Sequence, residues 1–154
     1  MIVTAWRITK RSRSHDAFTG DGAKKYGGRW NSPGTPCIYT AQSQALAALD
    51  FLVHTESPEL LAKYVLIAVE IDEQFISEIS RSLLPRNWQA DPSHPKLRHV
   101  GDQWVNDAST AVLRVPSALV PNEHNFLLNP LHPDFKNLRI GKPISFRFDS
   151  RLSR

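Results

Sequence analysis

The stretch 37–56 constrains the fold of this chain more than any other. Residues 38–40 predict a short strand, which runs into a helix that begins near Ser43, a favourable helix N-cap residue. From 45 to 53 every residue is apolar except Asp50. A carboxylate on such a helix costs free energy unless a cation or a hydrogen-bond donor meets it. The rest of the chain therefore has to supply that partner.

Helical spacing places Asp50 on one face with Leu46, Leu49 and Val53, at positions i, i+3, i+4 and i+7. Two interpretations follow from this placement. Either Asp50 marks a narrow hydrated side of the helix, or it is a carboxylate at the mouth of a cleft, held ionised by nearby arginine.

The length and composition of the chain are those of one globular domain, which we expect to span 1–154. Apolar residues make up 41% and charged residues 22% of the chain, and no apolar run approaches the length of a membrane span. We find no signal-peptide pattern and expect a cytoplasmic protein with no membrane contact. Cys37 is the single cysteine, which excludes an intramolecular disulfide and argues for a small buried side chain.

The formal net charge is +4 and the isoelectric point is about 9.5. This excess points to an anionic partner, which could be a nucleic acid, a phosphorylated small molecule or an acidic protein. Charge alone does not distinguish these classes.

Strands and helices alternate irregularly along the chain, which favours an α+β fold with a mixed sheet over a strict βαβ repeat. The clearest strand is 64–72, which is apolar enough for the middle of a sheet. Further strands are predicted over 2–9, 110–115, 138–140 and 144–148, helices over 73–84 and 96–107, a helical turn over 131–135 and a surface excursion over 85–95.

Two short motifs place arginines where they could meet a ligand. Arg7 interrupts the apolar strand 2–9, and it lies either on the hydrated face of an edge strand or in a pocket. Gly27 and Gly28 precede Arg29 and Trp30. Paired glycines can bring the backbone close to a ligand while the next side chains enter its groove, although they also occur in simple turns.

The sequence lacks the common motifs for metal binding, serine hydrolysis and phosphate-binding loops, and we predict no metal site. It offers instead arginine, tyrosine and carboxylate side chains, together with a polar loop around Ser117 and Asn125. Arginine binds pyrophosphate, an aromatic ring packs on a flat base, and a carboxylate can stabilise an oxocarbenium-like transition state. This set suits a ligand with a pyrophosphate, a ribose and a flat ring.

The order of these pieces resembles the RES domain family, the toxins of bacterial Xre–RES toxin–antitoxin pairs. The resemblance spans nearly the whole chain and is carried by Trp6-Arg7-Ile8, Gly28-Arg29-Trp30-Asn31, Cys37-Ile38-Tyr39-Thr40, the helix over 45–54 and the segments 115–121 and 125–135. It implies a mixed, mostly antiparallel split sheet with flanking helices, similar to ADP-ribosyltransferases of the diphtheria-toxin type. It also implies that the chain consumes NAD as its substrate and pairs with an Xre-type helix-turn-helix antitoxin.

The same resemblance assigns roles to individual residues. It implies that Arg7 and Arg29 position the ligand, that Tyr39 is the pocket aromatic and that Asp50 occupies the acidic position; together these four form the expected catalytic set. Trp30, Ser117 and Asn125 complete the expected NAD-binding set. The family usually has glutamate where this chain has Asp50. Because aspartate is one methylene shorter, a displacement of about 1 Å could cost roughly a hundredfold in rate. Glu56 is a lower-ranked substitute.

The leading functional prediction is cleavage of the nicotinamide–ribose bond of NAD by water or phosphate, which would deplete NAD and arrest growth. An alternative keeps the pocket and transfers ADP-ribose to a cellular protein. A third is a basic nucleic-acid-binding module that stacks bases on Trp30 and Trp88, and a fourth is an inactive family member. In the toxin interpretation, DNA is reached only through the antitoxin, and a homodimer stays open.

Overall fold

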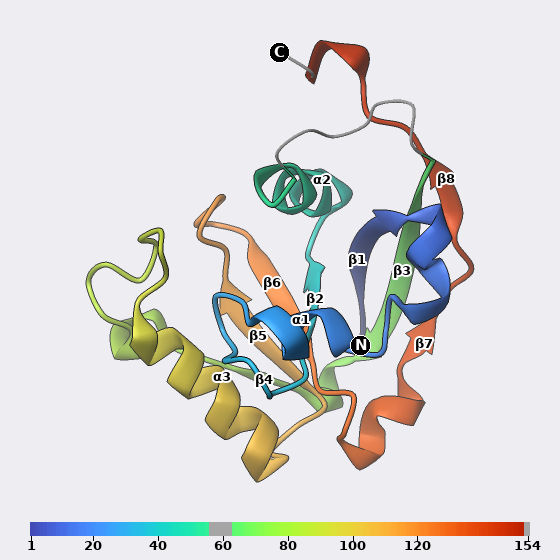
Figure 1. Cartoon of the computed structure of the whole chain (residues 1–154). Coiled ribbons are helices and arrows are strands. Elements are labelled where there is room, and N and C mark those ends of the chain that lie inside the picture. The colour runs from blue at the N-terminus through green and yellow to red at the C-terminus, as the bar shows by residue number, and fades with distance from the viewer. Residues whose placement is uncertain (56–62, 153–154) are drawn as a thin grey trace.

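The computed structural model describes residues 1–55 and 63–152 (Figure 1). Its three α-helices in these ranges are α1 (Asp21–Tyr26), α2 (Gln44–Val53) and α3 (Pro95–Asp107). Its strands are β1 (Ile2–Lys10), β2 (Ile38–Ala41), β3 (Tyr64–Asp72), β4 (Ile76–Glu78), β5 (Val112–Pro116), β6 (His124–Leu128), β7 (Arg139–Ile140) and β8 (Ile144–Phe146). The expected α+β class is confirmed.

The eight strands form one curled sheet in the order β4-β5-β6-β2-β1-β3-β7, and β8 also pairs with β3 (Figure 1). All pairs are antiparallel except β4–β5. The ladder between β1 and β3 has nine residue pairs, whereas β1 and β2 share the single pair Trp6–Ala41. The sheet is therefore weakly joined at β1–β2, which agrees with the split sheet that the family resemblance implied.

The strand predicted over 64–72 has these bounds in the structure, because its apolar run lies between β1 and β8 and is buried. The helix predicted over 73–84 is wrong. Two short 3-10 turns, Glu73–Phe75 and Arg81–Leu83, flank strand β4 in this segment. Its residues pair with β5, and this long-range pairing overrides the local helical tendency.

Helix α3 covers the half of the sheet that contains β5 and β6 (Figure 1). Pro95 stands at its first turn, and His94 caps it by accepting a hydrogen bond from the Lys96 amide at 3.0 Å. Its buried positions are Leu97, Gly101, Trp104 and Val105. They follow the spacing of one helical face, which packs against Leu113, Val115 and Leu127.

Helix α2 lies at one end of the sheet and contacts β1 and β2 (Figure 1). The predicted cap is confirmed, because the Ser43 hydroxyl accepts a hydrogen bond from the Leu46 amide at 3.0 Å. The predicted core face is not the observed one: Leu46 and Ala47 are buried, whereas Leu49 and Val53 are 42% and 57% exposed. A helix that is apolar nearly all round has no unique core face in its sequence, so the sheet decides which side is covered.

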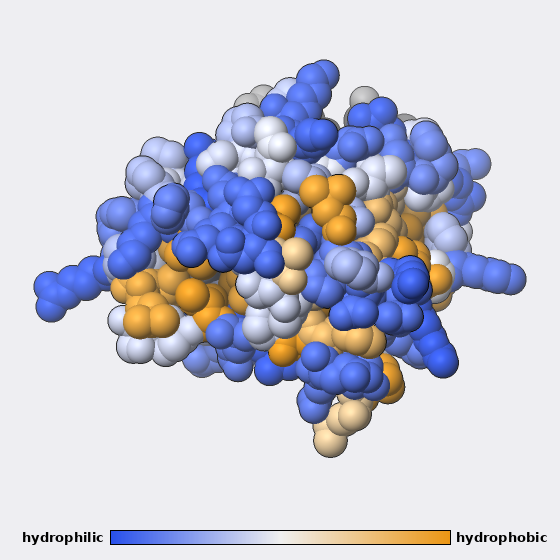
Figure 2. Space-filling model, turned by 90° about the horizontal axis from the view of Figure 1, so that it is seen from below, coloured by the Kyte–Doolittle hydropathy of each residue, from blue (hydrophilic) through white to orange (hydrophobic). Residues whose placement is uncertain are grey.

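The face of the molecule seen from below has hydrophobic patches interrupted by hydrophilic residues (Figure 2). Within the described ranges, none of the helices combines the length and the apolar character that a membrane crossing requires.

Candidate active site

Arg7 lies at the split between the two halves of the sheet. It projects from β1, and its Nη1 donates a hydrogen bond to the main-chain carbonyl of Tyr39 on β2 at 2.9 Å. Burial lowers the pKa of the Arg7 guanidinium, and its Nε is buried without a hydrogen-bond partner. In residues 1–55 and 63–152, Arg7 has no ion pair with a carboxylate. The charge of Asp16 acts on this pKa in the opposite direction to burial. Arg7 is thus a buried cation without a direct carboxylate contact in these ranges, not an arginine on the hydrated face of an edge strand.

Asp50 receives its partner from β6. Nδ2 of Asn125 donates to Oδ2 of Asp50 at 2.8 Å and also to the main-chain carbonyl of Thr40 at 3.1 Å. Burial raises the pKa of Asp50, whereas the hydrogen bond from Asn125 and the nearby His54 act in the opposite direction. We expected arginine to hold this carboxylate ionised. The structure corrects that expectation, because the observed partner is an amide.

Strand β2 brings four of the predicted residues together. Tyr39 belongs to β2 and accepts from Arg7, while Asn125 pairs with Ala41 in the β2–β6 ladder and links that strand to Asp50. Arg7, Tyr39, Asp50 and Asn125 therefore meet around 39–41.

The side chain of Arg29 hydrogen-bonds to a different segment of the chain. Its Nη1 donates to the main-chain carbonyls of Trp88 and Ala90, at 3.2 and 2.9 Å. The surface excursion predicted over 85–95 thus contributes two acceptors to the arginine that follows the paired glycines.

Trp30 differs from the expectation. The side chain is 2% exposed and packs in the hydrophobic cluster beneath α3. Because its ring is buried in the hydrophobic core, it cannot stack on a ligand or on a nucleic-acid base. Gly-Arg-Trp patterns do not reveal this, because an aromatic residue after a turn serves a core and a binding groove equally well.

Ser117 is fully buried, and its hydroxyl accepts hydrogen bonds from the amides of Leu119 and Val120 at 3.1 and 3.0 Å. These contacts shape the turn before β6. Cys37 is the small buried side chain that we predicted, at 3% exposure, and burial raises the pKa of its thiol to about 12.

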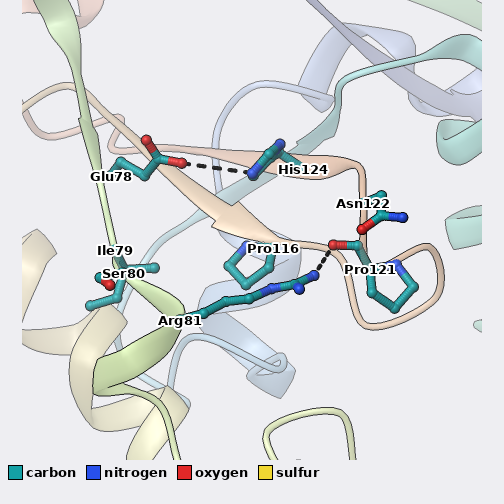
Figure 3. Close-up of a pocket in the computed structure, with 8 residues that line it drawn as sticks. All are labelled: Glu78, Ile79, Ser80, Arg81, Pro116, Pro121, Asn122 and His124. Carbon is teal, nitrogen blue, oxygen red and sulfur yellow. Dashed lines mark hydrogen bonds and ion pairs between the residues drawn. The ribbon is translucent and has the colours of Figure 1, made fainter.

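A cavity of about 550 Å³ is lined by residues from β4, β5, β6 and the segments next to them (Figure 3). None of its lining residues belongs to the predicted set; they are Glu78, Ile79, Ser80, Arg81, Pro116, Pro121, Asn122 and His124. His124 and Asn125 are adjacent in β6, so their side chains leave opposite faces of the sheet. Two pairs of its lining residues contact each other: Nε2 of His124 lies 3.6 Å from Glu78, and Arg81 donates to the Pro121 carbonyl.

Sequence reasoning missed the residues that fix the loop around Arg29. Oδ1 of Asp102 accepts from the Ser32 amide at 2.8 Å, and Nε of Arg98 donates to the Gly28 carbonyl at 3.1 Å. Both belong to α3, about seventy positions along the chain, so only the topology brings them here. Asn31 was part of the motif Gly28-Arg29-Trp30-Asn31, but nothing in the sequence indicated that its side chain is fully buried, with 0% exposure.

Glu56, the lower-ranked substitute for Asp50, lies outside the described residues. Across the described ranges, no group of three or more His, Cys, Asp or Glu side chains is arranged to hold a metal ion.

Comparisons with known proteins give a consistent result. The family model described as RES domain matches residues 4–149. A Yersinia enterocolitica protein named Toxin Res is 40% identical over 148 residues, which cover 96% of this chain and 97% of that protein. A Sphingobium protein named Prs ADP-ribosylating toxin is 36% identical over 159 residues, covering 100% of this chain and 99% of that protein.

The fold is also similar to a solved structure. One chain of the M. tuberculosis MbcT-MbcA toxin-antitoxin complex superposes with a TM-score of 0.79 at 20% identity, over 96% of this chain and 85% of that chain. At this identity the likeness concerns the fold alone.

Proposed function

Because this chain belongs to the RES domain family, we propose that it is the toxin of a bacterial toxin–antitoxin pair and an enzyme that cleaves the nicotinamide–ribose bond of NAD. Water or phosphate accepts the ADP-ribosyl group, so that NAD is depleted and growth stops. Full-length relatives named Toxin Res and Prs ADP-ribosylating toxin support this assignment.

The observation that carries the proposal is the environment of Arg7. A buried guanidinium is costly unless an anion compensates it. Within the described residues its Nη1 donates to a neutral carbonyl, and its Nε has no acceptor. A pyrophosphate offers a directly bound anion, which Arg7 does not receive from the described residues, and arginine binds such oxygens bidentately. Within the described residues Arg29 likewise donates to carbonyls alone, and we assign it as the second phosphate- or ribose-binding group.

Asp50 supplies the electrostatic part of the reaction. When the bond between ribose C1′ and the nicotinamide nitrogen breaks, its electron pair leaves with nicotinamide and positive charge develops on the ribose. The ionised carboxylate stabilises that charge. The acceptor then attacks C1′; a water loses its proton in doing so. Asn125 holds the carboxylate in place through the 2.8 Å hydrogen bond, which favours the ionised form.

The other expected residues contribute to the pocket in different ways. The ring of Tyr39 packs against the nicotinamide end, and Ser117 shapes the polar turn next to Asn125. Trp30 is left out of the binding set because the hydrophobic core surrounds it.

A turnover assay tests the assignment. Purified protein is incubated with NAD, and released nicotinamide is measured for the wild type, Asp50→Ala and Arg29→Ala. We expect each variant to lose about a hundredfold or more in kcat/KM, which is typical for removal of a transition-state electrostatic contact. Asp107→Asn and Arg86→Ala are matched controls at exposed positions and should keep wild-type turnover. Unchanged turnover in both site variants would remove the site assignment, and an inactive wild type would favour the inactive-member alternative.

Transfer of ADP-ribose to a cellular protein is the second candidate, favoured by the name of the Sphingobium relative, Prs ADP-ribosylating toxin. Mass spectrometry of cellular proteins after induction separates the two. Loss of NAD without labelled protein supports hydrolysis or phosphorolysis, whereas ADP-ribose on one target supports transfer.

The toxin assignment includes a cognate antitoxin, which we propose is an Xre-type helix-turn-helix protein that blocks the pocket and alone contacts DNA. The chain acts as a single domain in the cytoplasm. Strands from both ends of the chain, β1 and β8, pair with β3, which supports the single domain. The co-purified complex should show no NAD cleavage; full activity in the complex would contradict pocket occlusion.

A further inference from the structure

The hydroxyl of Tyr39 is fully engaged within the protein. It donates a hydrogen bond to Oδ1 of Asn31 at 2.5 Å and accepts one from the main-chain amide of Trp30 at 3.1 Å. Burial is the main reason why the pKa of Tyr39 is raised well above its usual value, so the hydroxyl keeps its proton and remains a donor. A hydroxyl with these two partners has no proton left to donate to a ligand.

Asn31 is the fixed end of this contact. It is 0% exposed, and its Nδ2 donates to the carbonyls of Ala23 and Thr35 at 2.8 and 2.9 Å. These bonds orient the amide so that Oδ1 faces Tyr39. The main chain closes the same turn, because the Gly28 amide donates to the Asn31 carbonyl at 2.9 Å.

The turn 28–31 fits tightly around the hydroxyl. A Cβ added at Gly28 would lie 2.5 Å from the Tyr39 hydroxyl oxygen and 2.9 Å from Oδ1 of Asn31. Arg29 stands between the two anchored positions, Gly28 and Trp30, and its side chain reaches the carbonyls of Trp88 and Ala90. The path of the backbone at residue 29 is therefore set by contacts that Arg29 does not make itself.

From these contacts we infer that Asn31 and the Tyr39 hydroxyl are positioning groups that act through Arg29: they fix the turn that aims its guanidinium at the ligand. This inference rests on the proposed function, in which Arg29 binds NAD, and it gives the hydroxyl of Tyr39 no contact with the substrate.

Tyr39→Phe is the main test, because it removes one oxygen atom and keeps the ring. Tyr26→Phe is the matched control, since Tyr26 is 73% exposed. Two measurements precede any assay: hydrogen exchange at the Trp30 amide and the NMR signal of the Arg29 side-chain Nε–H. Tyr39→Phe should speed the exchange at least tenfold and shift the Arg29 signal, whereas Tyr26→Phe should change neither. Unchanged exchange or an unmoved Arg29 signal would overturn the inference.

The kinetic test compares two backgrounds. Tyr39→Phe should lower kcat/KM for NAD by about tenfold in the wild type, as expected when one hydrogen bond is lost and an arginine is displaced. In the Arg29→Ala background the same change should have almost no further effect. An equal loss in both backgrounds would contradict positioning through Arg29, and would indicate direct substrate contact or a general structural defect. A wild type that leaves NAD intact overturns the proposed function instead; the exchange and NMR measurements then decide on the positioning contact alone.

Discussion

Asp50 shows at the scale of one residue how burial and charge compete. Burial raises its folded-state pKa above the usual 3.8, so the folded protein holds this proton more tightly than the unfolded chain does. The protonated carboxyl therefore favours folding below about pH 4, and this contribution is lost as the pH rises through the raised pKa.

Substitution of Asp50 makes this effect measurable. Asp50→Asn removes the titration and keeps an oxygen that can accept from Asn125. We expect the melting temperature of Asp50→Asn, relative to the wild type, to increase as the pH rises from 4 to 7. Thermal unfolding across this range is the measurement, with Gln103→Ala as the control, because Gln103 is exposed on α3 and carries no titrating group. If the difference in melting temperature between Asp50→Asn and the wild type stays constant with pH, burial does not raise the pKa of Asp50.

The predicted site residues differ in how far the sequence could place them. Arg7 and Asp50 were identified because each is a lone charge in an apolar element, and such a charge has a physical cost that a sequence displays. The partner of Asp50 could not be identified in this way. Asn125 stands 75 positions away and reaches the carboxylate only because β6 pairs with β2.

At the scale of elements, α3 is fixed by one position without a side chain. A Cβ at Gly101 would lie 1.6 Å from the carbonyl oxygen of Trp30. Helix and turn thus touch backbone to backbone, and the Asp102–Ser32 hydrogen bond lies beside this contact.

Gly101→Ala should force α3 away from the turn that carries Arg29. We expect a loss of about 3 kcal/mol or more in the free energy of unfolding, because a backbone atom cannot move aside as a side chain can. Gly22→Ala in α1 is the matched control: apart from the local helix backbone and the chain neighbours, no atom lies within 4 Å of its added Cβ. Alanine should therefore be neutral or stabilising by up to about 1 kcal/mol. Urea unfolding of both variants checks this, and equal stabilities would contradict the close contact.

Helices and strands could be predicted where their own residues carry a clear hydrophobic pattern. Helix α3 carries an amphipathic pattern, and β3 carries an apolar run, so both were found with nearly the observed bounds. Strand β4 has only three residues, and its sole ladder is the parallel one with β5. Nothing local distinguishes it from the helix that we predicted there.

On the scale of the whole molecule, aromatic side chains join helix α2 to the part of the sheet formed by β3 and β8. Phe148 lies 5.1 Å from Tyr64 of β3, 5.0 Å from Phe146 of β8 and 5.7 Å from Phe51 of α2, measured between ring centroids. Its side chain is 3% exposed. This cluster packs the last strand and the helix that bears Asp50 into one unit.

Phe148→Ala should therefore destabilise the protein by about 3–5 kcal/mol, the usual cost of removing a buried phenylalanine. Ile144→Ala is the control in the neighbouring strand; Ile144 is 58% exposed, and its loss should cost less than about 1 kcal/mol. Denaturant unfolding compares the two. Similar stability of both variants would show that the cluster does not hold the C-terminal segment.

Both candidate arginines bind main-chain carbonyls: Arg7 that of Tyr39, and Arg29 those of Trp88 and Ala90. A carbonyl is present whatever side chain its residue carries. Over evolutionary time, the side chains of the segment 85–95 can therefore be substituted while its carbonyls still accept hydrogen bonds from Arg29, provided that the backbone keeps its path. Two descendants of one ancestor could then share this arrangement while their alignments over that segment look unrelated.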